Sequence, residues 1–185
     1  MKLDLAELSV TEILKLYSEV MYQLAAKNIT SSSNNPVADY TENLVCEALS
    51  LDRYQQSTAG YDAIDPATSL KYQIKGRRIT PSNKSTQLSS IRNLDKRPFD
   101  ILVAVVFKSN FKIDYAIKFQ WESLKGITYV KHTNSWKLMA NKSWLGKSGV
   151  EDITKALEKT ESSWGSRKHL YLRSEENKSK PRGIR

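Results

Sequence analysis

The sequence has only one cysteine and no long apolar run. The first excludes a disulfide within the chain, and the second argues against a membrane-spanning helix. Because Cys46 is alone, no disulfide can form within the chain, and a reducing compartment suits it. The longest apolar run is ILVAVVF at 101–107, far short of the roughly 20 residues that a helix needs to cross a bilayer. The N-terminal MKLDLAELSV contains acids and no apolar core. We therefore expect no secretory signal and no membrane partner, and we predict a cytoplasmic protein.

Motifs of several enzyme classes are missing as well. The chain contains no phosphate-binding loop, no GxSxG nucleophile motif and no GxGxxG dinucleotide motif. Its two histidines, His132 and His169, lack metal-ligand spacing, and one cysteine cannot make a zinc framework. The sequence gives no support for Ser/His/Asp hydrolysis or for a zinc site.

Positive charge is what the sequence has in excess. Its 29 Lys and Arg against 20 Asp and Glu give a net charge of +9, which suits an anionic partner such as nucleic acid, although many basic proteins bind none. Residues 165–185 carry a net +5 and little periodicity. We predict one domain over residues 1–164 and a basic tail over 165–185, flexible at least from residue 174. That tail is either a solvated terminus or a non-specific phosphate contact.

The apolar spacing predicts an α/β fold, with a mixed sheet flanked by helices. Ser9 and Glu12 have the spacing of a capping box, so a helix should start there and end near Asn28. A second helix is expected from about residue 37 to 51. The pattern after it predicts strands at 53–58, 60–65, 70–76, 99–108, 111–119 and 133–140, and helices at 86–94, 119–125 and 148–159. The order from residue 37 to 108 is then helix, three strands, helix, strand.

The stretch GYDAIDPATSLKYQIKG at 60–76 predicts a β-hairpin with its turn at 66–69. With that turn, Asp62 lies opposite Gln73. Side chains alternate along a strand and directly opposed residues share a face, so Asp62, Gln73 and Lys75 should gather on one face. Asp65 should point the other way. A register slip of one residue would reverse this, so Asp65 is a reserve candidate.

The gathered residues have the chemistry of a magnesium site. Mg²⁺ takes hard oxygen ligands and keeps several waters, and the Asp62 carboxylate, the Gln73 amide oxygen and the Ile74 backbone carbonyl are such ligands. Lys75 can polarise an attacking water or offset charge on a phosphate. Glu42 on the preceding helix can add a second carboxylate. Such a polar trio on a strand pair is also typical of a solvated sheet face.

A helical Glu, then GYD, then QIK resembles the PD-(D/E)xK nuclease superfamily, whose restriction-endonuclease-like core has the same helix and strand order. The QxK form resembles Mrr-type restriction endonucleases, and the Gly-x-Asp start resembles archaeal Holliday-junction resolvases. More closely, the chain resembles a largely uncharacterised family of small bacterial proteins with this fold. The stretches that carry the resemblance are LSVTEILKLY, PVADYTENLVCEALSL, residues 57–107 and HTNSWKL.

The resemblance implies a metal-dependent endodeoxyribonuclease of restriction or defence type, using Mg²⁺ with Mn²⁺ as a possible substitute. It places Asp62 on the metal, Gln73 in the place of the usual acid, Lys75 as the motif lysine and Glu42 as the helix carboxylate. An amide brings no charge, so metal should bind more weakly than at a Glu-containing site. Tyr61 stands where the motif has proline. These departures leave a catalytically silent DNA-binding module open.

Basic and polar residues after the motif suit contacts with a DNA backbone. They are expected on a loop and a helix, and they are Arg77, Arg78, Asn83, Lys84 and Arg92. A third interpretation is an interaction subunit of a larger defence or repair complex. Cutting both strands of a duplex would need two active sites, which is compatible with a homodimer.

Overall fold

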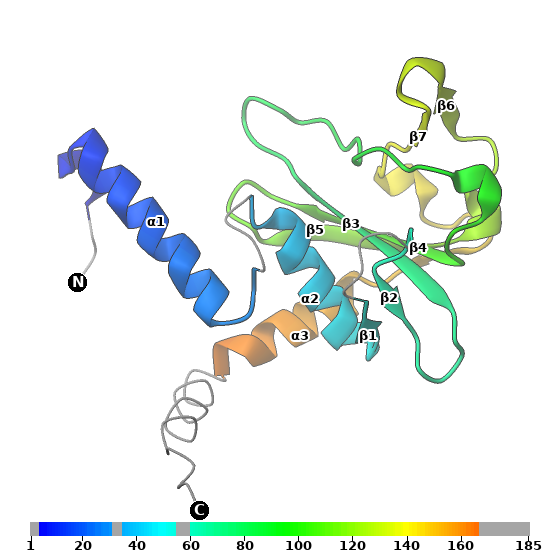
Figure 1. The fold of residues 1–185 in the computed structure, drawn as a ribbon, viewed down its shortest axis with the longest axis horizontal. Helices are drawn as coiled ribbons and strands as arrows, with labels where there is room; N and C mark the ends of the chain where they lie inside the picture. Colours follow the sequence, from blue (N-terminus) through cyan, green and yellow to red (C-terminus); the bar gives the residue numbers. More distant parts are fainter. Residues whose placement is uncertain (1–3, 31–34, 55–59, 167–185) are drawn as a thin grey trace, which may run out of the picture. The chain divides into compact units, whose positions relative to one another are not determined.

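We describe a computed structural model of the chain, which places residues 4–30, 35–54 and 60–166 (Figure 1). The chain divides into two compact units, residues 1–40 and 41–185, and each is described by itself. The predicted tail lies outside the described residues from residue 167 onward, as does most of the predicted strand at 53–58. Of the helices in the described ranges, none combines the length and the apolar content that a bilayer crossing requires.

The first unit contains helix α1, Val10–Ala26, after a 3₁₀ turn at Leu5–Glu7. The predicted capping box is present. The Ser9 hydroxyl accepts a hydrogen bond from the Glu12 backbone N–H, and the Glu12 carboxylate accepts one from the Ser9 backbone N–H at 2.8 Å. This reciprocal pair satisfies two of the N–H groups that a helix start leaves without an intrahelical partner. The predicted first helix is therefore confirmed.

The second unit is built on a mixed six-stranded sheet in the order β1-β2-β3-β4-β5-β8 (Figure 1). These strands are β1 Asp52–Arg53, β2 Ala63–Ile64, β3 Lys71–Arg78, β4 Ile101–Phe107, β5 Ile113–Gln120 and β8 Val150–Asp152. Only β3 and β4 pair in parallel, and the other neighbours in this sheet are antiparallel. A separate hairpin joins β6, Thr128–Val130, to β7, Ser135–Lys137. The predicted α/β class with a mixed sheet is confirmed.

Both faces of the sheet are covered, which is why β4 can be apolar along its whole length. All seven β4 residues are buried, as a strand covered on both faces should be. Helix α3, Thr154–Ser166, packs on β5 at one face, and the Thr154 hydroxyl accepts the Ala116 N–H there at 2.9 Å. Helix α2, Val37–Leu49, meets α3 through Glu47, whose carboxylate accepts the Trp164 indole N–H at 2.7 Å.

The opposite face of the sheet is covered by the β3–β4 connection and by the segment that includes β7. The buried cluster there comprises Leu102, Ala104, Val106, Tyr115, Ile117 and Phe119 of the sheet, with Leu88, Ile91, Leu94, Phe99, Leu124, Leu138 and Ala140 above them. Partners in β3 and β4 share a face, and Lys75 pairs with Ala104. Lys75 therefore points toward this cluster and the connection that covers it.

The predicted helix at 86–94 is wrong. Gln87 and Ile91 instead form single β-bridges with Met139 and Trp136, and the Leu88 N–H donates to the Leu138 carbonyl at 3.0 Å. The three-residue spacing of the apolar residues fits a helix equally well. A nine-residue helix is marginal alone. Residues 136–139 of the same chain offer backbone groups as hydrogen-bond partners instead. Only a 3₁₀ turn remains in this region, at Leu94–Lys96.

Candidate functional site

The hairpin register brings Asp62 to Gln73, as predicted. Ala63 pairs with Tyr72 across β2 and β3, and the Asp62 N–H donates to the Tyr72 carbonyl at 2.7 Å. At the entrance to the hairpin, Gly60 has φ +77°, and a Cβ on it would lie 2.9 Å from the Pro98 Cβ. Both the positive φ and this close approach require glycine. The glycine of GYD therefore fixes how the chain enters the site.

The Asp62 carboxylate is held by two donors from β3. Its Oδ2 accepts the Ile74 backbone N–H at 2.6 Å and a side-chain N–H of Gln73. Burial nevertheless raises the pKa of Asp62, and it outweighs the opposing effects of the hydrogen bonds from Ile74 and Gln73 and of the nearby Lys75 charge. The fold has thus placed a half-buried carboxylate whose ionised form is less favoured than that of an exposed aspartate.

Lys75 lies beside this pair under the β3–β4 connection. Its Nζ donates to the Ser89 hydroxyl at 3.1 Å. Burial lowers the pKa of Lys75, and the positive charge of Arg92 lowers it further, whereas Asp62 and Glu42 act to raise it. The lysine therefore stands among two acids and an arginine, near enough for all three charges to act on it.

Glu42 lies on α2 and is paired with an arginine. Its Oε2 accepts Arg53 Nη2 at 2.7 Å and Arg53 Nε at 3.2 Å. The side chains of Glu42 and Arg53 are only 22% and 30% exposed, so this is a half-buried ion pair. Glu42 is thus close to the site, with Arg53 as a counter-ion that the sequence did not reveal. Cys46 on the same helix is no nucleophile, because burial raises the pKa of its thiol to about 12.

Asp65 has a different task in the same hairpin. Its Oδ1 accepts the Ala67 N–H at 2.9 Å, and its Oδ2 accepts the Thr68 hydroxyl at 2.7 Å. The hydrogen bond from Thr68, followed by that from Ala67, lowers the pKa of Asp65. The reserve candidate therefore closes the turn, where Ser69 has φ +62°.

The carboxylate, amide and carbonyl oxygen atoms of the hairpin could act as ligands of a weakly held Mg²⁺. In a strand the N–H and C=O of one residue point to the same edge, so the Ile74 carbonyl faces the side from which its N–H reaches Asp62. Gln73 supplies a nitrogen to Asp62 in this arrangement, and rotating the amide by half a turn would bring its oxygen there instead. No three His, Cys, Asp or Glu side chains among the described residues form a group that could hold a metal. One carboxylate, one amide and one carbonyl suit an ion that keeps its waters.

The predicted DNA contacts are more dispersed than the sequence indicated. Arg77 and Arg78 belong to the end of β3, not to a loop, so alternation sends them to opposite faces. Arg77 Nε donates to the Ser85 carbonyl at 2.8 Å, and the Arg78 guanidinium lies 4.5 Å from the Phe111 ring centre. Arg92 stands on an irregular segment, not on the predicted helix.

The two remaining predicted contacts lie on the loop after β3. Asn83 closes a turn with Thr80 by mutual backbone hydrogen bonds of 2.9 and 3.1 Å. Lys84 follows and is exposed, as is Arg92. These two are the exposed cations of the predicted set, and their side chains are accessible to a phosphate backbone.

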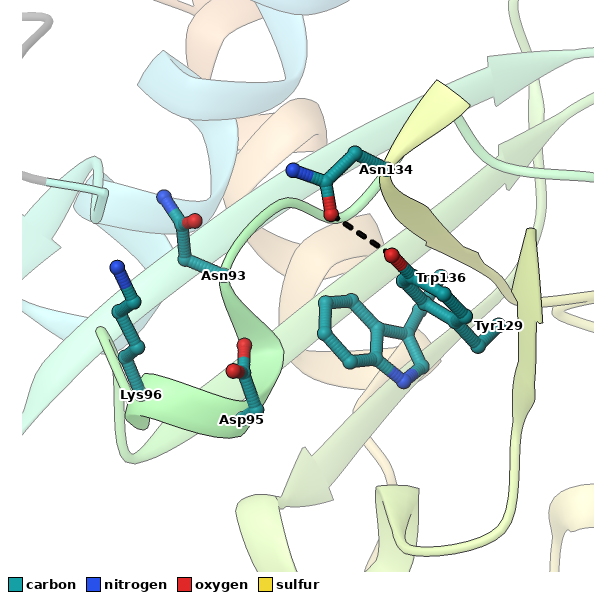
Figure 2. A pocket seen from close by; sticks show the side chains of 6 residues that line it. All are labelled: Asn93, Asp95, Lys96, Tyr129, Asn134 and Trp136. Atoms are coloured by element: carbon teal, nitrogen blue, oxygen red, sulfur yellow. Dashed lines mark hydrogen bonds between the residues drawn. The ribbon is translucent and has the colours of Figure 1, made fainter. Parts of the chain in front are cut away.

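Sequence reasoning missed two contacts at this site and one pocket lined by other residues. It did not find Arg53 as the partner of Glu42, nor Ser89 as the partner of Lys75, because both contacts depend on how distant segments fold together. It also missed a pocket of about 320 Å³ between the 3₁₀ turn at 94–96 and the β6–β7 hairpin (Figure 2). No sequence motif marks this pocket.

No protein-family model matches the chain, and no curated protein is significantly similar to it. The assignment to the nuclease superfamily therefore stays a prediction that rests on the residues themselves.

Proposed function

We propose that the protein is a metal-dependent phosphodiesterase that acts on DNA. The observation that carries the proposal is the contact of Asp62 with Gln73 and the Ile74 N–H, with Lys75 next along the same face of β3. A carboxylate whose burial disfavours its charge is suited to receiving a cation. The net charge of +9 suits a polyanionic substrate.

Each residue has a separate role in this proposal. Asp62, with the Gln73 amide oxygen and the Ile74 carbonyl, would hold Mg²⁺, and the bound ion would supply charge stabilisation at the phosphate. Lys75 is fixed by Ser89 and would donate a hydrogen bond to a phosphate oxygen or orient the attacking water. Glu42 acts on Lys75 through its charge. It is paired with Arg53 in a half-buried place.

One observation favours a second candidate, a DNA-binding module without catalysis. Glu42, the second acid of the expected set, forms an ion pair with Arg53, and Gln73 adds no negative charge. A site with a single charged ligand holds metal weakly, so binding of DNA without hydrolysis is the alternative outcome.

Cleavage is tested on supercoiled plasmid and on linear duplex and single-stranded DNA, with Mg²⁺, with Mn²⁺ and with EDTA. We expect cleavage with either ion and none with EDTA. An Asp62→Asn preparation is the matched control for a contaminating nuclease, because it keeps the size of the side chain and removes its charge. Cleavage that survives in this variant, or in EDTA, would contradict the proposal.

Binding is tested separately from cleavage by the salt dependence of DNA affinity. Lys84→Gln and Arg92→Gln should each reduce the slope of log K against log salt by about 0.9 on duplex DNA. Lys159→Gln is the matched control, since it removes the same charge from an exposed position on α3. Salt-dependent binding without cleavage under any ion would leave the DNA-binding module as the function.

A further inference from the structure

The pocket in Figure 2 has one aromatic wall and one polar wall. Asn93, Asp95 and Lys96 come from the end of the β3–β4 connection, and Tyr129, Asn134 and Trp136 come from the β6–β7 hairpin. Its volume of about 320 Å³ lies at the small end of the range of about 300–1,000 Å³ for ligand pockets. That size suits a single nucleotide or a molecule of similar bulk.

The aromatic wall is a cross-strand pair held in place from behind. Tyr129 pairs with Trp136 across the hairpin, and their ring centres lie 4.8 Å apart. Trp136 is tied to Ile91 by two backbone hydrogen bonds of 2.8 and 3.1 Å, and its side chain packs partly against the buried cluster. Tyr129 is 48% exposed. An exposed ring on a rigid support provides a stacking surface for a planar ligand.

The polar wall offers both kinds of hydrogen-bonding group. Asp95 has a carboxylate, which when ionised only accepts hydrogen bonds, whereas the amides of Asn93 and Asn134 can also donate. The Asn134 oxygen already accepts the Tyr129 hydroxyl at 2.9 Å, which leaves the Asn134 NH₂ group to donate. Guanine presents two adjacent donors, N1–H and the N2 amino group, next to its O6 acceptor. The Asp95 carboxylate can accept hydrogen bonds from such a pair of donors, and an amide NH₂ that lines the same pocket can donate to O6.

The pocket is continuous with the hairpin site along one stretch of chain. Ser89 holds Lys75 at the start of this stretch, and the charge of Arg92 acts on Lys75. Asn93 and Asp95 then line the pocket. Arg92 lies between Ser89 and the pocket residues in the sequence and is exposed, so its charge is available to a nucleic-acid strand bound near Lys75. Lys96 at the pocket adds another cation for the backbone.

We propose that this pocket binds an unpaired guanine base, stacked on the exposed ring of Tyr129, which packs on Trp136, and read by Asp95. Bases inside a duplex are stacked and paired, so a base in this pocket has to be single-stranded or flipped out. The inference deepens and rests on the proposed function, because it names the substrate as DNA with at least one unpaired nucleotide near the cleaved bond. The pocket itself can be tested without cleavage and without metal.

The test follows the four tryptophan indole N–H signals of the full-length protein by NMR during titration with GMP, AMP, CMP or TMP. Trp136→Phe assigns the Trp136 signal. We expect GMP to move this signal the most of the four indoles and to bind at least about fivefold more tightly than AMP. Base stacking contributes about 1–3 kcal/mol per base, so Tyr129→Ala should weaken all four nucleotides by about fivefold or more.

Asp95→Asn separates recognition of guanine from stacking. This variant keeps the shape of the side chain and replaces one acceptor oxygen by a donor, so the preference for GMP over AMP should disappear while AMP binding stays. Asp65→Asn is the matched control outside the pocket and should leave every titration unchanged. Equal binding of GMP and AMP by the unmodified protein, or an unchanged GMP preference in Asp95→Asn, would overturn the proposal.

A binding assay with DNA distinguishes failure of this inference from failure of the proposed function. The probes are a 12-nucleotide dT strand and the same strand with one central dG. We expect tighter binding of the dG strand by the unmodified protein and equal binding of both by Asp95→Asn. Metal-dependent cleavage without any dG preference would overturn the guanine pocket and leave the phosphodiesterase standing. A dG preference without cleavage would support the guanine pocket and contradict the phosphodiesterase.

Discussion

The two aspartates of the β2–β3 hairpin are three residues apart and have opposite environments. Asp62 accepts its hydrogen bonds from the neighbouring strand, and burial raises its pKa. Asp65 accepts its hydrogen bonds from the turn that it closes, and these lower its pKa. The hydrogen bonds of Asp65 therefore favour its ionised form, whereas burial disfavours the ionised form of Asp62.

This difference distinguishes Asp65, which stabilises the turn of the hairpin, from Asp62, which we propose to be a functional residue. For an acid, a raised pKa in the folded state means that the ionised form costs stability above the unfolded pKa, and a lowered pKa means that it contributes stability there. A buried charge that costs stability is typical of a functional position. Substitutions in and around the hairpin can show whether its two ends differ in this way.

The largest expected effect is on catalysis at Lys75. Lys75→Met keeps the apolar stem that lies under the β3–β4 connection and removes the charge and the hydrogen bond to Ser89. We expect DNA cleavage to slow by about 10²–10³, with metal affinity nearly unchanged. Single-turnover rates and metal titration measure the two quantities. A loss of metal binding as large as the loss of rate would place Lys75 in the metal site instead.

A second prediction concerns the charge of the Gln73 position. Gln73→Glu puts a second carboxylate beside Asp62, so we expect Mn²⁺ to bind about tenfold more tightly, because the charge of the ligand set controls affinity. Without metal the two carboxylates repel each other, so the melting temperature should fall. Saturating Mn²⁺ should restore it, since a ligand that binds only the folded state stabilises that state.

The matched comparison is Gln87→Glu, which introduces the same carboxylate in the β3–β4 connection away from Asp62. This control should show no stabilisation by Mn²⁺ beyond that of the unmodified protein. Equal stabilisation of the two variants would mean that the pair of residues 62 and 73 is no metal site.

A third and smaller effect concerns the ion pair behind the site. Arg53→Gln leaves Glu42 half-buried without its main counter-ion, so unfolding free energy should fall by about 1–2 kcal/mol. Glu42→Gln should cost a similar amount alone, and the double variant should cost less than the two single changes together. Urea denaturation of all four proteins completes this double-mutant cycle. Additive losses would show that the two side chains are not coupled.

The smallest predicted effect is the pH dependence at Asp65. Its lowered pKa means that the ionised form stabilises the fold above the ordinary value near 3.8, and that this contribution disappears as pH falls below it. Asp65→Asn should therefore lower the melting temperature at pH 6 and make little difference near pH 2.5. Cleavage at neutral pH should stay within about twofold. A pH-independent difference would mean that the turn hydrogen bonds do not depend on the charge.

Local patterns carried the parts of the fold that could be predicted. The capping box at Ser9, the apolar run of β4 and the turn chemistry after Asp65 each involve neighbouring residues, and the structure confirms all three. The register of the hairpin followed from its turn, which is why the contact of Asp62 with Gln73 was predicted correctly.

The parts that failed depend on contacts between distant segments. Residues 86–94 have a spacing that suits a helix, but Leu88 and Ile91 find their backbone partners some 45–50 residues later, at Leu138 and Trp136. The same pairing creates the pocket and brings Ser89 over Lys75. No local rule predicts such contacts, because a helix over residues 86–94 and the observed bridged segment would bury the same apolar side chains.

The most direct test of the central claim measures cleavage and stability together for Asp62→Asn and Asp65→Asn, under identical Mn²⁺ conditions at neutral pH. We expect Asp62→Asn to abolish cleavage and to melt at the same temperature as the metal-free unmodified protein or above it. We expect Asp65→Asn to retain cleavage and to melt at a lower temperature than the unmodified protein. If Asp65→Asn abolishes cleavage while Asp62→Asn retains it, the carboxylate at the strand is not the functional one and the proposed site is wrong.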